Sequence, residues 1–247
     1  MRILVFQHLA VEHTGVLGNF WRQAGHEEHV VELDEGETIP ALEDFDLLTV
    51  MGGPMDVWQE DAHPWLIPEK AAIRRWVRDL GRPYLGICLG HQLLADALGG
   101  EVSLMKASEV GLATVTLTEA GRRDPVLAGV TPELETFQWH SAEVSKLPAG
   151  CEVLAANRAC PTQAIRWGKW AYGFQYHMEI TDTTVSDWEQ IPEYKASLNE
   201  ALGPEKAARL SAIVEPQLPV FHKTARLLSE NLLSLIAQTP PIAPEKA

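Results

Sequence analysis

The sequence predicts an α/β fold, in which an open, doubly wound and mostly parallel sheet is flanked by helices and followed by a helical C-terminal extension. Short apolar segments alternate with amphipathic segments over residues 2–100, which is typical of parallel strands and their crossover helices. From residue 101 the segments are shorter and richer in β-type residues, and residues 182–237 return to helical spacing. At 247 residues, the chain is long enough for one substantial core.

The predicted strands and helices alternate regularly in the first part of the chain. Strands are expected at 2–6, 29–33, 46–53 and 84–88. Helices are expected at 16–25, 68–81 and 91–100. Gly25 and Gly81 suit helix ends, and Pro68 suits a first helical turn. Because apolar strands of this kind are buried on both faces, we expect helices on both sides of the sheet.

The rest of the chain predicts additions to the same domain. Segments such as "LATVTLT" and "ELETFQWH" predict antiparallel strands that extend the sheet. We expect one domain over 1–181, a helical extension packed on it over 182–237, and a loose tail over 238–247. The sequence has no internal repeat and no glycine/serine linker that would divide it further.

Composition and charge argue against several classes of protein. Hydrophobic residues make up 46% and charged residues 22%, which is ordinary for a globular protein. The formal net charge of −14 argues against a nucleic-acid or anionic-membrane surface. No apolar run approaches the length of a membrane span. The N-terminal "MRILVFQHLAVEH" lacks the long apolar region of a signal peptide, so it predicts a strand instead.

The three cysteines are Cys88, Cys151 and Cys160, and their spacing is not that of a metal site. With no export signal, we expect reduced thiols and a cytoplasmic location. Cys151 and Cys160 lie in stretches without further signals, and we expect them to be structural. The sequence predicts no metal ion and no cofactor.

Cys88 differs from the other two because it lies between Gly86 and Gly90, where a predicted strand meets a predicted helix. The pattern G-x-C-x-G at such a junction is the cysteine form of the nucleophile elbow, in which glycines leave room for a strained turn. The positive end of the following helix stabilises a thiolate, and the Leu89 N–H is placed to donate to an oxyanion. The alternative, from this pattern alone, is a βα turn with a small buried residue at its apex.

A thiolate nucleophile needs an imidazole, and the imidazole needs an orienting acceptor. Of the nine histidines, His177 ends the strand-like "YGFQYH" and is followed two positions later by Glu179. In an extended chain, side chains at i and i+2 point the same way, so Glu179 is able to reach the His177 ring. An isolated H-x-E is common, but combined with the elbow it predicts a triad of Cys88, His177 and Glu179.

Three motifs follow one another along the chain: "MGGP" at 51–54, "GICLGHQ" at 86–92 and "GFQYHMEI" at 173–180. In type and order they resemble the signatures of class I, or triad-type, glutamine amidotransferases, such as the glutaminase domain of GMP synthase. "FQWHSAEVSKLP" at 137–148 resembles the segment that lines the glutamine pocket in that family, and "KASEVG" at 106–111 resembles the stretch before its central strands. The resemblance implies a flavodoxin-like sheet with the cysteine at the carboxyl end of a strand.

The resemblance also implies roles for individual residues. Cys88 attacks the side-chain amide carbon of glutamine and forms a γ-glutamyl thioester. His177 gives a proton to the departing ammonia and then activates the water that releases glutamate, while Glu179 orients His177. The N–H groups of Gly53 and Leu89 form the oxyanion hole.

The substrate contacts that the resemblance implies are Gln92, His140 and Ser141. The residues alone leave alternatives, because Gln92 could cap a helix and His140 could be a satisfied histidine at a strand end. Two positions depart from the family pattern. Ala142 stands where many relatives have aspartate, which bears on recognition of the substrate's amino group, and Met178 stands where the familiar form has proline.

Two hypotheses of different classes follow for the function. The chain has neither a G-x-x-x-x-G-K-[ST] loop nor the S-G-G-x-D-S loop of pyrophosphatase-type synthetases, and 182–247 is too short for a second catalytic domain. The first hypothesis is a stand-alone cysteine hydrolase that acts on glutamine or a γ-glutamyl amide, including a γ-glutamyl-conjugate peptidase. The second is a non-fused glutaminase subunit that binds a separate synthetase and feeds it ammonia, with 182–237 as the docking surface.

Other roles remain open for the whole chain and for its C-terminal helices. A catalytically inactive relative could serve as an interaction module, and the helices of 182–237 could form the seam of a homodimer or cover the pocket mouth. We expect a small glutamine-like substrate as the principal ligand, and neither a nucleic acid nor a membrane as a partner.

Overall fold

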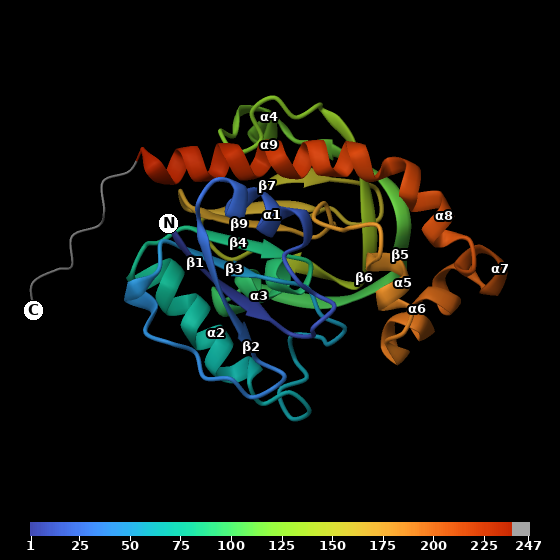
Figure 1. Cartoon of the computed structure of the whole chain (residues 1–247), viewed down its shortest axis with the longest axis horizontal. Helices are drawn as coiled ribbons and strands as arrows, with labels where there is room; N and C mark the ends of the chain where they lie inside the picture. The colour runs from blue at the N-terminus through green and yellow to red at the C-terminus, as the bar shows by residue number, and fades with distance from the viewer. Residues whose placement is uncertain (239–247) are drawn as a thin grey trace, which may run out of the picture.

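The computed structural model describes residues 1–238, which form a nine-stranded sheet with helices on both faces (Figure 1). The strand order is β2-β1-β3-β4-β9-β8-β7-β5-β6. The strands are β1 (Arg2–Gln7), β2 (Glu27–Glu32), β3 (Leu47–Val50), β4 (Tyr84–Ile87), β5 (Glu101–Leu117), β6 (Glu133–Lys146), β7 (Cys151–Ala156), β8 (Ala164–Trp167) and β9 (Ala171–Phe174).

The helices connect and cover these strands. They are α1 (Gly15–Gln23), α2 (Leu66–Arg74), α3 (Leu89–Ala97), α4 (Glu119–Arg123), α5 (Thr184–Trp188), α6 (Pro192–Leu202), α7 (Pro204–Ala207), α8 (Leu210–Val214) and α9 (Leu218–Ala237). A π-helical turn, Arg75–Asp79, continues α2. Short 3-10 turns lie at Leu42–Asp44 and Glu215–Gln217.

The first half of the sheet is parallel, as the sequence predicts. β1 pairs in parallel with β2 and β3, β3 pairs with β4, and β4 pairs with β9. Side chains along β1 alternate between two apolar clusters because successive residues of a strand point to opposite faces. Ile3 and Val5 join the cluster that includes α1 and α9, whereas Leu4 and Phe6 join the one that includes α2 and α3. The prediction of a doubly wound α/β sheet is confirmed.

The second half of the sheet contains the predicted antiparallel additions. β5 and β6 form a long antiparallel pair, and β7 and β8 extend the sheet in the same manner. β9 is antiparallel to β8 but parallel to β4. As a result, the residues that follow β9 lie beside the residues that follow β4, although they are far apart in the sequence.

The C-terminal helices pack on the sheet in two ways. The residues of α5 to α8 form a third apolar cluster with Phe137 and Trp139 of β6. Helix α9 crosses one face of the sheet beside α1 (Figure 1), where Trp21 Nε1 donates to Ser229 Oγ at 2.9 Å. The division into 1–181 and 182–237 stays a prediction, and the predicted tail lies outside the described residues except for Gln238. None of the helices within residues 1–238 has both the length and the apolar character needed to cross a membrane.

Candidate active site

The turn at Cys88 has the strained geometry of a nucleophile elbow. Its φ of 51° and ψ of −102° make Cys88 the one non-glycine residue with positive φ in the part of the chain that the structure describes. Such backbone angles cost about 1–3 kcal/mol and persist where the surrounding structure holds them. Neighbouring glycines make the turn possible: a Cβ at Gly86 would lie 2.5 Å from the Gly90 carbonyl carbon, and a Cβ at Gly90 would overlap the Val50 carbonyl oxygen.

The pairing of β4 with β9 brings the elbow and the H-x-E motif together. The Cys88 N–H donates to the Phe174 carbonyl at 2.8 Å, and Gln175 Nε2 lies 3.6 Å from the Cys88 sulfur. Two residues further on, the His177 N–H donates to the Phe137 carbonyl of β6 at 2.8 Å. Cys88 and His177 therefore lie at the same carboxyl edge of the sheet, where doubly wound folds place their ligands.

His177 is held between a carboxylate and the thiol. Its Nδ1 donates to Glu179 Oε1 at 2.7 Å, and the Met178 N–H donates to Glu179 Oε2 at 2.9 Å. The ring is 1% exposed and meets the edge of Trp188 at 4.7 Å between ring centroids. Burial opposes a positive charge on this ring, but Glu179 and ionised Cys88 more than offset it, so the pKa of His177 is raised well above its usual range.

The glycine pair that closes β3 lies against this centre. A Cβ at Gly52 would lie 2.5 Å from Glu12 Oε2 and 3.3 Å from His177 Cε1, and a Cβ at Gly53 would lie 3.0 Å from Leu89 Cδ2. A side chain at Gly52 would therefore displace the buried Glu12 carboxylate, and one at Gly53 would displace the ends of the Met55 and Leu89 side chains. Gly53 and Leu89 line the same pocket as Cys88, which is the arrangement expected of oxyanion donors.

The pocket above Cys88 has a volume of about 80 Å³ and includes all three residues predicted as substrate contacts. Gln92 Nε2 donates to the Ala142 carbonyl at 3.1 Å and to Gln175 Oε1 at 3.0 Å. His140 Nδ1 donates to the Ala142 carbonyl at 2.9 Å, and Ser141 accepts a hydrogen bond from Ser108 at 2.9 Å. Gln92 thus links α3 to β6 rather than capping a helix, and His140 is a partnered residue inside β6.

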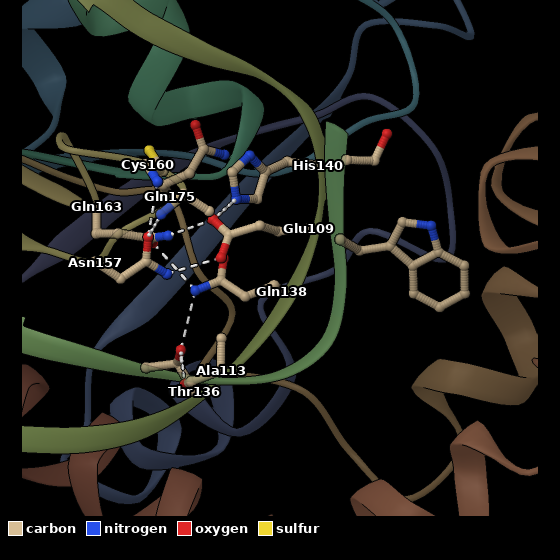
Figure 2. A network of polar contacts seen from close by, with 12 residues as sticks. Glu109, Ala113, Thr136, Gln138, His140, Asn157, Cys160, Gln163 and Gln175 are labelled. Carbon is tan, nitrogen blue, oxygen red and sulfur yellow. Dashed lines mark hydrogen bonds and ion pairs between the residues drawn. The ribbon is translucent and has the colours of Figure 1, made fainter. Parts of the chain in front are cut away.

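A buried polar network continues from His140 into the sheet (Figure 2). His140 Nε2 lies 3.3 Å from Glu109 Oε2, which also accepts a hydrogen bond from Gln163 Nε2 at 2.8 Å. Asn157 Nδ2 donates to Glu109 Oε1 at 2.7 Å, and Gln138 Nε2 donates to Gln163 Oε1 at 3.1 Å. Glu109 lies on β5, whereas Gln138 and His140 lie on β6, so these contacts connect both strands of the pocket wall to Asn157 and Gln163. Within residues 1–238, His140 Nε2 and Gln138 Oε1 have no hydrogen-bond partner.

The sequence analysis missed several residues near the centre. The Tyr194 hydroxyl donates to Glu12 Oε1, and Glu12 Oε2 has no hydrogen-bond partner among the described residues. Burial raises the pKa of Glu12 to about 7, although positive charge on His177 and the Tyr194 hydroxyl oppose this. Because Glu12 follows β1, its place at the carboxyl edge of the sheet was a usable signal. Tyr194 and Trp188 come from the C-terminal helices, where helical spacing indicated only apolar packing.

The other cysteines differ from Cys88 in their surroundings. Burial raises the pKa of Cys151 and of Cys160 to about 12, so neither is a thiolate at neutral pH. Within residues 1–238, no group of three or more His, Cys, Asp or Glu side chains could hold a metal ion.

Comparison with known proteins agrees with the fold and the motifs. The family model described as glutamine amidotransferase class-I matches residues 14–187. The chain therefore belongs to the class I glutamine amidotransferase family, and the resemblance stated from the motifs is confirmed.

Particular relatives and structures share most of the chain. It is 33% identical over 195 residues to the glutamine amidotransferase-like protein YfeJ of Salmonella typhimurium, covering 75% of this chain and 78% of that protein. It is 33% identical over 154 residues to a GMP synthase (glutamine-hydrolyzing) subunit of Sulfolobus acidocaldarius, covering 62% and 77%. A glutamine amidotransferase structure from Thermotoga maritima superposes with a TM-score of 0.83 at 26% identity, covering 97% of this chain and 99% of that one.

Proposed function

We propose that this chain is a cysteine hydrolase that cleaves the side-chain amide of glutamine, or of a γ-glutamyl amide. The observation that carries the proposal is the position of His177, which interacts with Cys88 on one side and with Glu179 on the other. An imidazole with a raised pKa is a strong proton acceptor, so His177 is suited to take the proton of the Cys88 thiol and generate the attacking thiolate.

The reaction proceeds in two halves. The Cys88 thiolate attacks the amide carbon, and the negative charge that develops on the carbonyl oxygen is held by the N–H groups of Gly53 and Leu89. The tetrahedral intermediate collapses as the C–N bond breaks, and His177 protonates the nitrogen that leaves as ammonia. Neutral His177 then takes a proton from water, whose oxygen attacks the thioester; the C–S bond breaks and releases glutamate and the thiolate.

The pocket wall suggests how the amino-acid end of the substrate is recognised. Ala142 has no carboxylate to offer a substrate ammonium, but Asp56 and Glu193 line the same pocket. Burial raises the pKa of Asp56 above its ordinary value, and an ammonium group beside it would favour its ionised form. Gln92, His140 and Ser141 complete the wall that we propose contacts the substrate.

The test is turnover of L-glutamine, γ-glutamyl-p-nitroanilide and glutathione by the purified protein, with Cys88→Ser as the matched control. We expect ammonia, p-nitroaniline or amine release from at least one of these and none with C88S. Labelling with a glutamine-analogue electrophile, followed by peptide mapping, should place the adduct on Cys88. Folded protein that turns over none of the panel, or a label on Cys151 or Cys160, contradicts the hydrolase proposal.

A second candidate is a glutaminase subunit that feeds ammonia to a separate synthetase. Its support is the similarity to a protein that is named as one subunit of GMP synthase. Copurification from the source cell, combined with native mass measurement, distinguishes the two proposals. A synthetase that raises glutamine turnover when added supports the subunit role, whereas full glutamine turnover by a lone chain or a homodimer supports the stand-alone hydrolase.

A further inference from the structure

His8 lies buried beneath the glycine pair and takes no part in the proposed triad. It follows β1 directly and has no exposed surface. Its Nδ1 lies 2.8 Å from the Gly52 carbonyl oxygen, and its Nε2 lies 2.8 Å from Glu69 Oε1 on α2. Trp65 stacks on the ring at 5.3 Å between centroids, with an interplanar angle of 15°. Both ring nitrogens and one ring face of His8 are therefore held.

The two hydrogen bonds define a buried ion pair. A carbonyl oxygen only accepts, so Nδ1 carries a proton, and the second nitrogen faces a carboxylate that is also fully buried. Burial disfavours the imidazolium, but Glu69 and the Gly52 carbonyl more than offset this, and the pKa of His8 is raised. The hydrogen bond to Gly52 is then charge-assisted, and such bonds are stronger than neutral ones.

Burying an ion pair rarely increases stability by itself, so we looked for a function of the His8–Glu69 pair. The bond that the pair makes is to the Gly52–Gly53 peptide, whose two glycines have the widest freedom to rotate. In a trans peptide, the C=O and the following N–H point in opposite directions. A fixed Gly52 carbonyl therefore fixes the direction of the Gly53 N–H.

We propose that His8, held by Glu69, is a positioning residue for the oxyanion hole: it anchors the Gly52 carbonyl so that the Gly53 N–H faces the pocket at Cys88. Gly53 lines that pocket, and a Cβ added to it would lie 3.0 Å from Leu89 Cδ2 and 3.2 Å from His8 Cβ, which places Gly53 between the pocket and the anchor. The inference rests on the proposed hydrolysis at Cys88 only for its kinetic consequence. The orientation of the peptide can be observed without turnover.

Four variants distinguish the effect of the His8–Gly52 hydrogen bond from the effect of the His8 charge and from a general loss of stability. His8→Leu removes the donor, His8→Asn keeps a donor near the Nδ1 position, and Glu69→Gln keeps the histidine but removes its counter-charge. Ile73→Ala is the matched control, because Ile73 is fully buried on the same helix as Glu69 and packs in the adjoining apolar cluster. Urea unfolding measures the free energy of unfolding of each variant. Ile73→Ala is a valid control if it loses about as much stability as His8→Leu.

We expect His8→Leu to lower kcat for glutamine by about 10²-fold with little change in KM, which is the effect of losing one oxyanion donor. His8→Asn should recover about tenfold of that loss, because it restores a neutral donor. Ile73→Ala should leave kcat within about twofold of the wild type at temperatures where it is folded. Equal kcat losses in His8→Leu and Ile73→Ala would overturn the proposal.

The pH profile adds a readout that a purely structural role does not affect. The titratable groups that face His8 are Glu69 from α2 and Glu12 after β1, and Tyr84 of β4 faces Glu69. In Glu69→Gln, burial is no longer offset by this carboxylate, so the pKa of His8 should fall. The kcat of Glu69→Gln should then decrease with rising pH over a range where that of the wild type is constant. Profiles of the same shape for both proteins count against the ion pair.

Crystal structures of the wild type and of His8→Leu decide the point independently of activity. We expect the Gly52–Gly53 peptide to turn in His8→Leu, moving the Gly53 N–H away from the Cys88 sulfur. A turned peptide in a protein that hydrolyses no glutamine would support the positioning role and contradict the proposed function. An unchanged peptide with undiminished kcat would contradict the positioning role and leave the proposed function standing.

Discussion

Two buried acid–base pairs flank Gly52, and they differ in how their charge is satisfied. On one side, His8 has an opposite charge in Glu69, and both ring nitrogens have partners at 2.8 Å. On the other side, Glu12 has a neutral partner in Tyr194. Within residues 1–238, Glu12 Oε2 and Glu69 Oε2 both lack a hydrogen bond, so the two pairs differ in the charge of the partner and not in this respect. Burial disfavours both charges, yet the pKa of His8 rises toward the charged form and that of Glu12 rises toward the neutral form.

The opposite protonation preferences of His8 and Glu12 show how the surroundings decide the charge of a buried group. At His8, the Glu69 carboxylate offsets the loss of hydration. At Glu12, the charge on His177 and the hydrogen bond from Tyr194 offset it only in part, and the negative charge of Glu179 adds to the effect of burial. The pair on the His8 side is therefore suited to hold the backbone in one orientation. The pair on the Glu12 side, which also faces His177, is suited to change its protonation near neutral pH.

The largest effect is expected from His177→Asn, which removes the proposed acid–base group and the cation that Glu12 faces. We expect kcat for glutamine to fall by about 10³-fold or more, as for loss of a general acid–base group. His29→Asn is the control, because His29 is exposed on the edge strand β2, and its kcat should match the wild type. Activity of H177N within tenfold of the wild type would contradict the assignment of His177.

A second test crowds the glycine that separates the two pairs. In Gly52→Ala, the new Cβ would lie 2.5 Å from Glu12 Oε2, so we expect kcat to fall by about 10²-fold and stability to fall by about 1–3 kcal/mol. Combining it with Glu12→Ala removes the obstructing carboxylate. Recovery of stability in the double variant, measured as a coupling energy by urea unfolding, places the clash on the Glu12 side; additive losses would exclude it.

Glu12→Gln tests the pair of Glu12 and Tyr194 through stability. Because the folded-state pKa of about 7 exceeds the ordinary 4.5, the folded protein binds this proton more tightly than the unfolded chain. The resulting stability is fully present below the ordinary pKa and is lost as the pH rises through the folded-state value. The loss amounts to about 3 kcal/mol for a shift of this size.

In Glu12→Gln this decline should disappear, so the variant should gain stability relative to the wild type as the pH is raised from acid to mildly alkaline. The measurement is the free energy of unfolding in urea at several pH values across that range. Parallel pH curves for the two proteins would show that Glu12 is not the titrating group.

The smallest effect is expected at a third carboxylate, that of Glu179, whose oxygens both have partners. Met178→Pro removes the N–H that donates to Glu179 Oε2, and we expect kcat to fall by about 3–10-fold, the range for the net contribution of one ordinary hydrogen bond. Met178→Ala keeps this N–H while it removes the buried side chain, so it is the matched control. If the alanine variant loses as much kcat as the proline variant, packing rather than the hydrogen bond is responsible.

Much of the fold followed from local pattern, and the misplaced boundaries have local causes. The strand predicted at 29–33 is β2, Glu27–Glu32, an edge strand whose exposed positions carry no apolar signal for where it starts. The helix predicted at 68–81 is α2 followed by the π-helical turn Arg75–Asp79, which has the same apolar face but different backbone hydrogen bonds. Side-chain periodicity reports which face is buried and not which carbonyl each N–H reaches.

In the candidate site, too, the features that the sequence predicted are those that depend on local structure. The glycines around Cys88 carry their own signal, because a Cβ at Gly86 or Gly90 would overlap backbone atoms, and the pair Gly52–Gly53 is a recognisable motif where the backbone passes close to other side chains. His177 and Glu179 are two residues apart, so an extended chain is enough to join them. These features depend on short-range sterics, which the sequence expresses directly.

The sequence by itself indicated the doubly wound sheet, the turn at Cys88 and the H-x-E motif, but the pairing of β4 with β9 brought the last two together. Only the tertiary structure decided that His8 meets Glu69 across 61 positions and that Glu12 meets Tyr194 across 182. The physical reason is that the charge of a buried group depends on lost hydration and on partners brought in by other elements. Neither quantity exists until the helices have packed against the sheet.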